Sequence, residues 1–203
     1  MYKIYHTSNY YMWRKNMSYK SDSNKTERNC FTRMCIGEAL INLMQQKEYK
    51  SIKISDIVER AGISRMTYYN YYHSKTDILE DYLQELVGDY IRSANAEENK
   101  NKIGGFQDYE HILHALNFFD QYADFFLTLV RADLYSVIID AIDLFMEEQI
   151  LPVYPRSVYR LYCYAGALLH TFIKWEEHGK KESVEEIANI IVSFVRNYED
   201  IEE

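Results

Sequence analysis

Proline and glycine are scarce in this sequence, which holds only 2 prolines and 7 glycines among 203 residues. Proline interrupts a helix by removing an amide donor, and glycine weakens a helix because it loses more conformational entropy than other residues. Their scarcity, together with 47% hydrophobic residues arranged in long amphipathic runs, predicts an all-α protein with a sizeable core. No Pro/Gly linker occurs early in the chain, so the boundary between its two parts is expected inside a helix.

Cysteines and long apolar runs are also few. The three cysteines, Cys30, Cys35 and Cys163, form no C-x-x-C motif and cannot all pair. Reduced thiols in a cytoplasmic protein are therefore the expected state. No apolar run reaches the ~18 residues that a membrane-spanning helix needs, and no apolar leader stands at the start of the sequence. We therefore expect no membrane partner.

Motifs of catalysis and cofactor binding are missing as well. The sequence has no Gly-rich phosphate loop, no G-x-S-x-G, no H-E-x-x-H and no suitably partnered Cys/His pair. It predicts neither catalytic residues nor a cofactor, and the chain is not expected to be an enzyme. His111 and His114 lie three residues apart, but no Cys or acid stands beside them at ligand spacing. We expect partly exposed polar positions there and no metal.

Charge is distributed unevenly along the chain, whose formal net charge is −8. Residues 1–80 carry 13 Lys and Arg against 8 Asp and Glu, a net charge of +5. The remainder carries 10 against 23, a net charge of −13. Phosphates attract a basic segment and repel an acidic one. The division fits a DNA-binding head joined to a body that stays off the duplex.

The stretch 51–79 contains the strongest local signals. Ser55 is expected to cap a helix over residues 56–61, because a serine oxygen accepts from the free amides of a helix's first turn. Gly62 is expected to end that helix, since glycine readily adopts the left-handed backbone of a C-terminal cap. Ala61, Gly62 and Ile63, a small residue, a glycine and an apolar residue between two short helices, are typical of a helix-turn-helix. The second helix of such a unit lies in the major groove.

Two further caps follow in the same stretch. Ser64 is expected to cap a second helix over residues 65–72. Ser74 is expected to cap a third, with Asp77 at the third helical position completing a capping box. This acid also lies near the positive end of the helix dipole.

Residues of this stretch follow a spaced pattern made of Ala61-Gly62-Ile63-Ser64, Thr67, Tyr69, Tyr72, Ser74-Lys75 and Asp77-Ile78-Leu79. The pattern resembles that of the TetR family of transcriptional regulators. Family members typically have A-G-V-S, two variable residues, T-(F/L)-Y, a variable residue, H-F, one residue, S-K and an acid before L-L. The resemblance extends over residues 27–80.

Two tyrosines depart from the family pattern. Tyr71 stands where the family has His, and it can still donate one hydrogen bond to a phosphate. Tyr72 stands where the family has Phe, so its hydroxyl requires a partner. Tyr68 and Tyr72 lie four residues apart on one helix face, and both are expected to be buried.

The resemblance implies that the chain binds double-stranded DNA at a palindromic operator as a homodimer. Arg65 is then expected to reach guanine O6 and N7, and Met66 or the Thr67 methyl group to touch a thymine methyl. Other side chains are expected to lie near phosphates, Tyr69, Tyr71 and Lys75 among them. The full set of expected DNA contacts is Arg28, Lys53, Ser55, Ser64, Arg65, Met66, Thr67, Tyr69, Asn70, Tyr71 and Lys75.

Helical spacing of apolar residues continues through the chain. Further helices are predicted over residues 25–47, 74–91, 109–119, 120–131, 134–151, 157–178 and from Ser183 onward, with a loop over 97–105. The predicted parts are a flexible arm (1–24), a helix-turn-helix domain (25–80) and a dimerisation and effector domain (81–203). The arm holds five tyrosines without period, and is either a disordered leader or a basic arm that reaches DNA.

The last two predicted helices are apolar on more than one face, which predicts contact with a second subunit. Ala165-Gly166-Ala167 lies in mid-helix, where small residues allow another backbone to approach closely. The C-terminal part resembles, more weakly, TetR-like bodies related to the dihydroxyacetone-kinase activator. The matching residues are Ala165-Gly166, Trp175, Gly179 and Ser183-Val184-Glu185-Glu186. This second resemblance implies no particular ligand.

Aromatic side chains are abundant in the C-terminal part, and most are expected in the core. A few could line an apolar cavity for a small apolar or aromatic effector, for which we expect Phe126, Met146, Tyr162 and His170. His170 is alternatively a core histidine with satisfied hydrogen bonds. An effector would shift the population between DNA-competent and splayed dimers through the helix that begins at Ser74.

These features together predict a cytoplasmic TetR-type regulator of transcription. We expect a repressor that binds its operator as a homodimer and is released by a small-molecule effector. The alternative is a TetR-like protein that acts as a protein-interaction co-regulator, without an effector or without DNA binding of its own.

Overall fold

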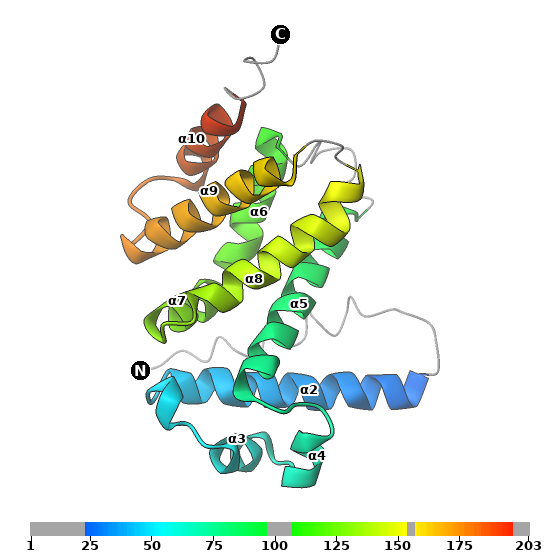
Figure 1. The fold of residues 1–203 in the computed structure, drawn as a ribbon. Coiled ribbons are helices and arrows are strands. Elements are labelled where there is room, and N and C mark those ends of the chain that lie inside the picture. Colours follow the sequence, from blue (N-terminus) through cyan, green and yellow to red (C-terminus); the bar gives the residue numbers. More distant parts are fainter. Residues whose placement is uncertain (1–22, 97–106, 154–156, 197–203) are drawn as a thin grey trace.

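The computed structural model describes residues 23–96, 107–153 and 157–196, and within these residues all regular structure is helical. This confirms the all-α prediction. Helices α2 (Ser23–Met44), α3 (Ile54–Ala61) and α4 (Arg65–Tyr69) form a head at one end of the molecule (Figure 1). A short 3-10 turn, Tyr49–Ser51, connects α2 with α3. Most of the predicted arm and the whole predicted loop lie outside the described residues.

The body is built on α5 (Lys75–Ala94), which rises out of the head and continues between the helices of the body (Figure 1). Around it lie α6 (Tyr109–Asp120), α7 (Ala123–Arg131), α8 (Tyr135–Phe145), α9 (Val158–Glu177) and α10 (Val184–Arg196). A π-helical turn, Met146–Ile150, and a 3-10 turn, Leu151–Val153, extend α8. Because α5 belongs to both parts, a change in its tilt moves the head relative to the body.

Most of the predicted helix boundaries agree with the structure within a few residues, and two differ for local reasons. The second helix of the turn unit was expected to reach residue 72, but α4 ends at Tyr69. The amides of Tyr71 and Tyr72 both donate to the Tyr68 carbonyl, at 3.0 Å each, which tightens the chain into a turn. In the predicted helix 134–151, the backbone widens into the π turn before Pro152, which cannot donate an amide hydrogen bond.

The caps at Ser64 and Ser74 are confirmed. The Thr67 amide donates to Ser64 Oγ at 3.0 Å, and the Asp77 amide donates to Ser74 Oγ at 3.1 Å. The Ser74 amide in turn donates to Asp77 Oδ2 at 3.1 Å, which completes the capping box. These bonds fix the first turns of α4 and α5.

The cap predicted at Ser55 is wrong, because α3 begins at Ile54 and Ser55 lies inside its first turn. Lys53 is the N-cap residue, and its amide donates to Asp56 Oδ2 at 3.0 Å. The carboxylate of Asp56, and not the hydroxyl of Ser55, therefore accepts a backbone hydrogen bond at the start of α3. The other end of α3 is as predicted, since Gly62 has a left-handed backbone with φ of 67°.

The core of the head is apolar and joins all four helices that meet there. Ile36 and Leu40 from α2, Ile57 from α3, Tyr68 from α4 and Leu79 from α5 are fully buried. Burial of such side chains contributes about 1.5–3 kcal/mol each to folding. The expectation that Tyr68 and Tyr72 are buried is confirmed.

The two buried tyrosines differ in what their hydroxyls contact. Tyr68 has no hydrogen-bond partner for its hydroxyl among the described residues, and burial raises the pKa of this group to about 12. Tyr72 donates to Asp81 Oδ2 at 2.5 Å. The hydroxyl that departs from the family pattern is thus satisfied by α5.

We predict opposite effects for two matched substitutions. Tyr68→Phe removes an unsatisfied buried hydroxyl and should leave the free energy of unfolding unchanged or raise it by up to about 1 kcal/mol. Tyr72→Phe removes a charge-assisted hydrogen bond and should lower that free energy by about 1–3 kcal/mol. Urea denaturation of both variants measures the difference. A Tyr68→Phe variant as unstable as Tyr72→Phe would contradict the assignment of these hydroxyls.

The body closes around a second part of the core. Ile112 and Leu116 from α6, Leu129 from α7, Ile138 from α8 and Leu161 from α9 are fully buried. Helix α10 packs against α6 and α9, and its first turn is capped by Ser183 and Glu186 in both directions. The described cysteines are unpaired. Among the helices that the structure describes, none is both long and apolar enough to cross a membrane.

A carboxylate pair lies where the end of α6 meets the end of α9. Asp120 forms a hydrogen bond with Glu176, and the ammonium group of Lys180 contacts Asp120. Burial, followed by this hydrogen bond, raises the pKa of Glu176 to about 7 from its ordinary 4.5. The folded protein therefore holds this proton at pH values where the unfolded chain has released it. Stability from this group is complete below about pH 4.5 and is lost as pH rises through 7.

We predict that Glu176→Gln removes the loss of stability at high pH, because the glutamine amide can still donate to Asp120 but carries no charge. The free energy of unfolding of the variant should exceed that of the wild type at pH 8 and should match it at pH 4.5. Thermal denaturation across this range measures both values. Glu177→Gln, at an exposed neighbour whose pKa is lowered by a hydrogen bond from Lys174, is the control and should show no gain at pH 8.

Candidate nucleic-acid interface and body cavity

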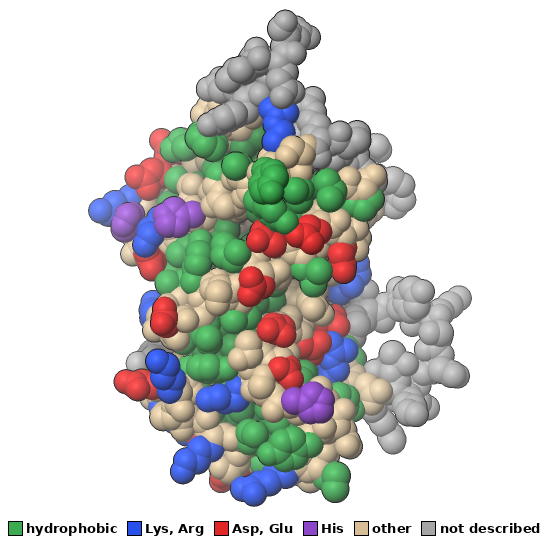
Figure 2. Space-filling model, viewed as in Figure 1, with side chains coloured by type: hydrophobic (Ala, Val, Ile, Leu, Met, Phe, Trp, Pro, Cys, Tyr) green, Lys and Arg blue, Asp and Glu red, His purple; other side chains and the backbone are tan. Residues whose placement is uncertain are grey.

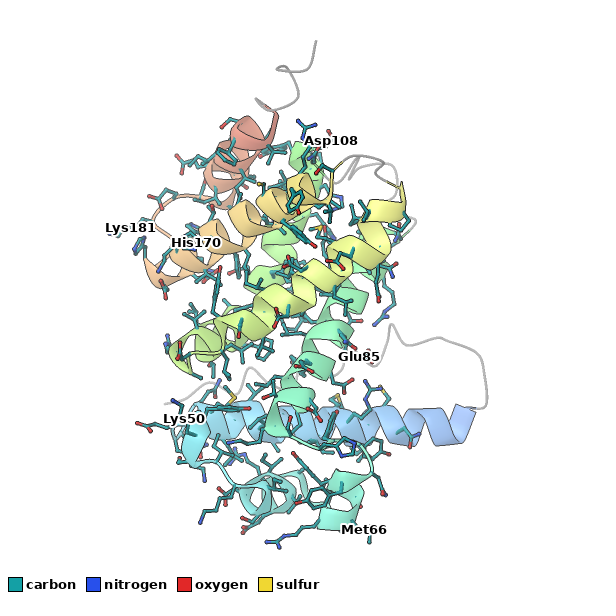
Figure 3. All side chains as sticks on the ribbon, viewed as in Figure 1. Lys50, Met66, Glu85, Asp108, His170 and Lys181 are labelled. Carbon is teal, nitrogen blue, oxygen red and sulfur yellow. The ribbon has the colours of Figure 1, made fainter. Side chains whose placement is uncertain are left out.

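Helix α4 presents its outer face at the tip of the head, where Met66 projects away from the molecule (Figure 3). Met66 is 74% exposed and Tyr69 is 51% exposed. Arg65 and Asn70 are also exposed. These side chains face outward because Tyr68, on the opposite side of the helix, is anchored in the core. Large apolar groups kept in water at a helix tip indicate a surface that contacts a partner.

Arg65 is an available cation on this face. Among the described residues, no acceptor is bonded to its guanidinium group. Thr67 is half-buried, and its hydroxyl lies 2.8 Å from Ser64 Oγ. A guanidinium beside apolar groups has the chemistry needed for guanine and thymine edges in a major groove.

Other basic side chains surround the tip. Figure 2 shows Lys and Arg side chains at the end of the molecule where the head lies. Lys50, Lys53 and Arg60 are exposed, and Lys50 lies at the side of the head (Figure 3). Arg28 belongs to α2, but its side chain is outside the described part of the structure. Cations around an exposed helix suit the phosphates on either side of a groove.

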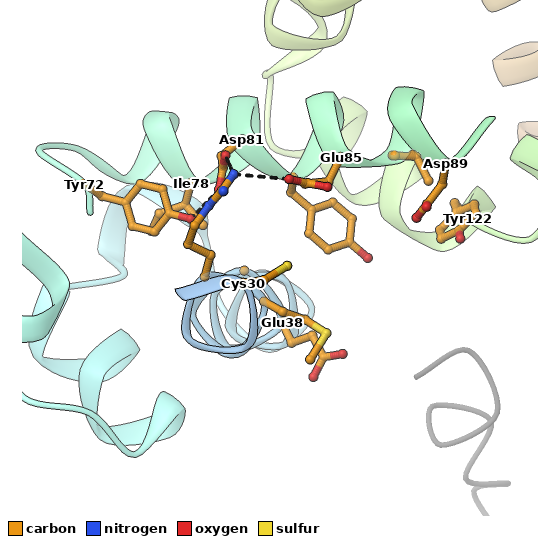
Figure 4. Close-up of a pocket in the computed structure, with 13 residues that line it drawn as sticks. Cys30, Glu38, Tyr72, Ile78, Asp81, Glu85, Asp89 and Tyr122 are labelled. Atoms are coloured by element: carbon orange, nitrogen blue, oxygen red, sulfur yellow. Dashed lines mark hydrogen bonds and ion pairs between the residues drawn. The ribbon is translucent and has the colours of Figure 1, made fainter. Parts of the chain in front are cut away.

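An ion-paired cluster connects α2, the end of the turn unit and α5 (Figure 4). Arg33 Nε donates to Asp81 Oδ2 at 2.8 Å, and the same carboxylate accepts from the Tyr72 hydroxyl. Arg33 Nη2 also lies 3.4 Å from Glu85 Oε1. The hydrogen bond to Asp81 raises the pKa of Arg33, and burial together with Asp81 raises the pKa of Tyr72. The cluster borders a cleft of about 80 Å³ and fixes α4 to the helix that enters the body.

The body contains a cavity of about 450 Å³ between α5, α6, α7, α8 and α9. Its wall is largely apolar and aromatic, and none of the 20 described residues that line it is Asp, Glu, Lys or Arg. The π turn after α8 contributes Met146, Gln149 and Ile150 to the wall. A mainly apolar concavity of this size with a few polar groups is typical of a small-molecule site.

Tyr90 and His111 are the main polar pair in this wall. The Tyr90 hydroxyl is hydrogen-bonded to His111 Nε2. Burial, with a smaller effect of His114, lowers the pKa of His111 to about 4, so the imidazole is neutral at pH 7. His114 lies beside it and contacts the Ser93 hydroxyl at 3.1 Å. No group of His, Cys, Asp and Glu in the described residues could hold a metal ion.

Comparison with known proteins identifies the head. Residues 36–82 match the family described as "Bacterial regulatory proteins, tetR family". These residues contain α3, α4 and the caps described above. The head of the molecule is thus similar to the TetR family. Its members are regulatory proteins and not enzymes, as we expected for this chain.

A curated TetR-family relative extends the likeness to the expected subgroup. The chain is 34% identical over 67 residues to the HTH-type dhaKLM operon transcriptional activator DhaS of Lactococcus lactis subsp. lactis strain IL1403. The match covers 31% of this chain and only 36% of that relative, about a third of its length. It supports the predicted similarity to the dihydroxyacetone-kinase regulator subgroup.

Solved structures of regulatory proteins share the fold of most of the chain. A TetR transcriptional regulator from Streptococcus agalactiae 2603V aligns with a TM-score of 0.60 at 21% identity, covering 84% of this chain and 97% of its own. The dihydroxyacetone kinase operon activator DhaS aligns with a TM-score of 0.53 at 22% identity, with the same coverage. The fatty acid degradation regulator FadR from Bacillus halodurans aligns with a TM-score of 0.52 at 16% identity, covering 81% and 94%. These alignments show a common fold.

Lys75, expected to hold a phosphate, occupies a different place in this TetR-family head. Its ammonium donates to the carbonyl of Tyr49 at 2.5 Å and to the carbonyl of Ile52 at 2.8 Å. It also lies 4.2 Å from the centroid of the Tyr49 ring. Lys75 therefore ties the start of α5 to the segment before α3. The contacts of Lys75 in the structure are within the head, and its contact with a phosphate stays a prediction.

Tyr71 also has an internal partner, because its hydroxyl donates to Asn29 Oδ1 on α2 at 2.8 Å. It is half-buried, while Tyr69 is exposed. A phosphate would have to replace Asn29 to accept from Tyr71. From within α3, the Ser55 hydroxyl donates to its neighbour Asp56 at 3.4 Å. Of these three side chains, Tyr69 is the one that the structure leaves on the outer surface.

We predict separable effects for two lysines of the head. Lys75→Met should lower the free energy of unfolding by about 1.5–3 kcal/mol, because hydrogen bonds from a charged donor are lost. Lys53→Met, at an exposed position, should leave stability unchanged and reduce the salt dependence of DNA binding by about one counterion. Urea denaturation and DNA titration at several salt concentrations measure the two effects. A stable Lys75→Met variant with a reduced salt slope would instead support the contact of Lys75 with a phosphate.

The cavity contains two of the four residues predicted to bind an effector. Phe126 and Met146 line it, but Tyr162 and His170 do not. The Tyr162 hydroxyl donates to Glu147, and His170 is exposed on α9, so it is neither a core histidine nor a cavity residue. The polar pair in the wall is Tyr90 with His111, which sequence reasoning missed. Tyr90 lies within the predicted helix 74–91, but its rotation toward α6 depends on tertiary packing.

Proposed function

We propose that this TetR-family regulator binds a palindromic operator as a homodimer, with α4 of each subunit in the major groove. The observation that carries this proposal is the outer face of α4, where Arg65, Met66 and Tyr69 project from a basic tip. A twofold dimer presents two such helices to half-sites about one helical turn apart. The DNA-binding unit ends at about residue 80, inside α5, and the remaining residues form the dimerisation and effector part.

The outer faces of α9 and α10 are the proposed dimer interface. Tyr159 is 73% exposed, Ile190 is 55% exposed and Phe194 is 52% exposed. Figure 2 shows hydrophobic side chains gathered over the part of the molecule where these helices lie. A Cβ atom added at Gly166 would meet nothing within 4 Å in the described chain. The space beside this glycine is thus open to the backbone of a second subunit.

We further propose that an effector in the body cavity releases the protein from its operator. The cavity borders α5, so occupation of the cavity can favour one tilt of this helix and thereby change the spacing of the two heads. Bound at a promoter, the dimer would repress by occupying the duplex. The relative DhaS is named as an activator. Whether this protein represses or activates transcription is therefore tested separately. Free thiols, as in the described cysteines, suit the reducing cytoplasm.

A gel shift with the promoter region of its own gene tests DNA binding. We expect a complex that survives competition with random duplex DNA and a protected site with twofold symmetry. In vitro transcription with the same fragment decides between repression and activation. Absence of any sequence preference would contradict the proposal and favour a protein-interaction co-regulator instead.

Sedimentation equilibrium tests the dimer. We expect a dimer in the wild type and a monomer for Ile190→Glu, because a buried unpaired carboxylate disfavours association. The control is Ser136→Glu, an exposed position on α8 that lies outside the proposed interface. A wild-type monomer, or equal effects of both substitutions, would contradict the assignment of this face.

A further inference from the structure

The wall of the body cavity restricts the charge of the molecule that it can hold. Among the described residues that line the cavity, none is charged, and His111 is neutral. Three further polar residues line it: Asn95 and Gln149 are exposed and lie at the boundary with solvent, and Tyr164 is buried. A carboxylate or ammonium group inside would have no counterion, and burial of an unpaired ion is strongly unfavourable. The occupant is therefore uncharged.

A continuous series of aromatic rings restricts its shape. Tyr90 lies 5.2 Å from Phe119, Phe119 lies 5.8 Å from Phe126, and Phe126 lies 5.7 Å from Phe172, all measured between ring centroids. The last two pairs meet edge to face, at 84° and 82°. All four residues line the cavity, and they come from α5, α6, α7 and α9 in turn. A planar aromatic molecule can extend this series through the same edge-to-face or offset contacts.

The Tyr90–His111 pair supplies the polar contact. The two groups already share one hydrogen bond, so a new group gains most if it can both accept from the Tyr90 hydroxyl and donate to His111 Nε2. A hydroxyl does both, whereas a ketone only accepts. The deep polar atoms of the wall are few, which leaves the remainder of the ligand apolar.

We propose that the cavity binds an uncharged aromatic alcohol or phenol, whose hydroxyl inserts between Tyr90 and His111 and whose ring packs along Phe119, Phe126 and Phe172. This inference rests on the proposed effector function and names its ligand class. Because Tyr90 belongs to α5 and His111 to α6, replacement of their direct hydrogen bond changes the contact between the helix that carries the head and the body. The ligand thus acts on the same helix that positions α4.

Isothermal titration of the full-length protein with four probes of similar shape tests the proposal. The probes are 2-naphthol, naphthalene, 2-naphthoate and 2-naphthylmethylammonium at pH 7. We expect 2-naphthol to bind about tenfold more tightly than naphthalene, through one additional buried hydrogen-bonding group. The two ions should bind more weakly than naphthalene. Equal binding of 2-naphthol and naphthalene, or tight binding of either ion, would overturn the proposal.

Two variants locate the contact. Tyr90→Phe should abolish the preference for 2-naphthol over naphthalene and leave naphthalene binding unchanged, which loss of folding would not do. Ala94→Phe, at the half-buried rim of the cavity, should weaken every probe. A preference for 2-naphthol that persists in Tyr90→Phe would contradict the assigned contact, and unaltered binding to Ala94→Phe would place the probe elsewhere.

Operator affinity, measured separately with and without 2-naphthol, distinguishes the two proposals. Intact operator binding with no binding of the neutral probe rejects the ligand class and leaves the DNA-binding function in place. Binding of 2-naphthol that lowers operator affinity about tenfold supports both proposals. Binding of 2-naphthol without any change in operator affinity supports the ligand class and contradicts release by an effector.

Discussion

Arg65→Ala is expected to weaken operator binding by about 1–3 kcal/mol for each half-site and to relax the preference at one base position. The guanidinium of Arg65 is exposed at the start of α4. In a major groove it can donate two hydrogen bonds to one guanine, which no other base pair accepts in the same way. A symmetric dimer loses the contact in both half-sites, so the total loss should reach about 2–6 kcal/mol.

Fluorescence anisotropy with the operator and with single-base variants of it measures this effect. The wild type should discriminate at the position that Arg65 reads, and the variant should bind all four bases there with similar affinity. Arg131→Ala, at an exposed arginine of the body, is the matched control and should leave DNA binding unchanged. Equal losses on operator and random DNA would show that Arg65 contacts phosphates instead of a base.

Asp81→Ala is expected to lower the free energy of unfolding by about 2–4 kcal/mol. The carboxylate of Asp81 accepts from Arg33 and from the Tyr72 hydroxyl at the same time. Its removal takes away the carboxylate that accepts from the buried Tyr72 hydroxyl, and it leaves the partly buried guanidinium with the more distant Glu85 as its nearest described carboxylate. The side chain of Arg33 is 34% exposed, so water compensates for part of the loss and places the effect below that of a fully buried pair.

Urea denaturation of Asp81→Ala against Glu80→Ala, an exposed neighbour on the same helix, measures this effect. The Tyr72→Phe and Asp81→Ala changes should be non-additive when combined, because both remove the same hydrogen bond. Operator affinity should also fall at temperatures where the protein is folded, since α4 is less firmly held to α5. Additive losses would contradict a shared contact.

The turn unit is the part that local sequence signals predicted well. Ser64, Ser74 with Asp77, and Gly62 act on amides and carbonyls within a few residues of themselves, so their effect is readable without knowledge of the rest of the fold. The same reasoning failed at Ser55, because α3 begins at Ile54 and the Asp56 carboxylate accepts from the amide of Lys53. The helical periodicity likewise identified the body helices and their approximate limits.

Contacts between distant segments could not be predicted in this way. Lys75 matches the family pattern, but whether its ammonium faces solvent or the Tyr49 and Ile52 carbonyls depends on how α5 meets the segment before α3. His170 has apolar neighbours in sequence, yet the rotation of α9 turns it outward and turns Phe172 into the cavity. A rotation of one helix by a fraction of a turn exchanges core and surface positions, and only packing against its neighbours sets it.

The sequence by itself determined a helical chain with a basic helix-turn-helix head, because caps, periodicity and charge act over short distances. Tertiary structure alone decided which polar groups meet: Tyr72 with Asp81 in the head, and Tyr90 with His111 in the wall of the cavity. The cavity itself arises where five helices and a π turn fail to fill the space between them. Such a space depends on the relative positions of all its walls, and no single segment of the chain encodes it.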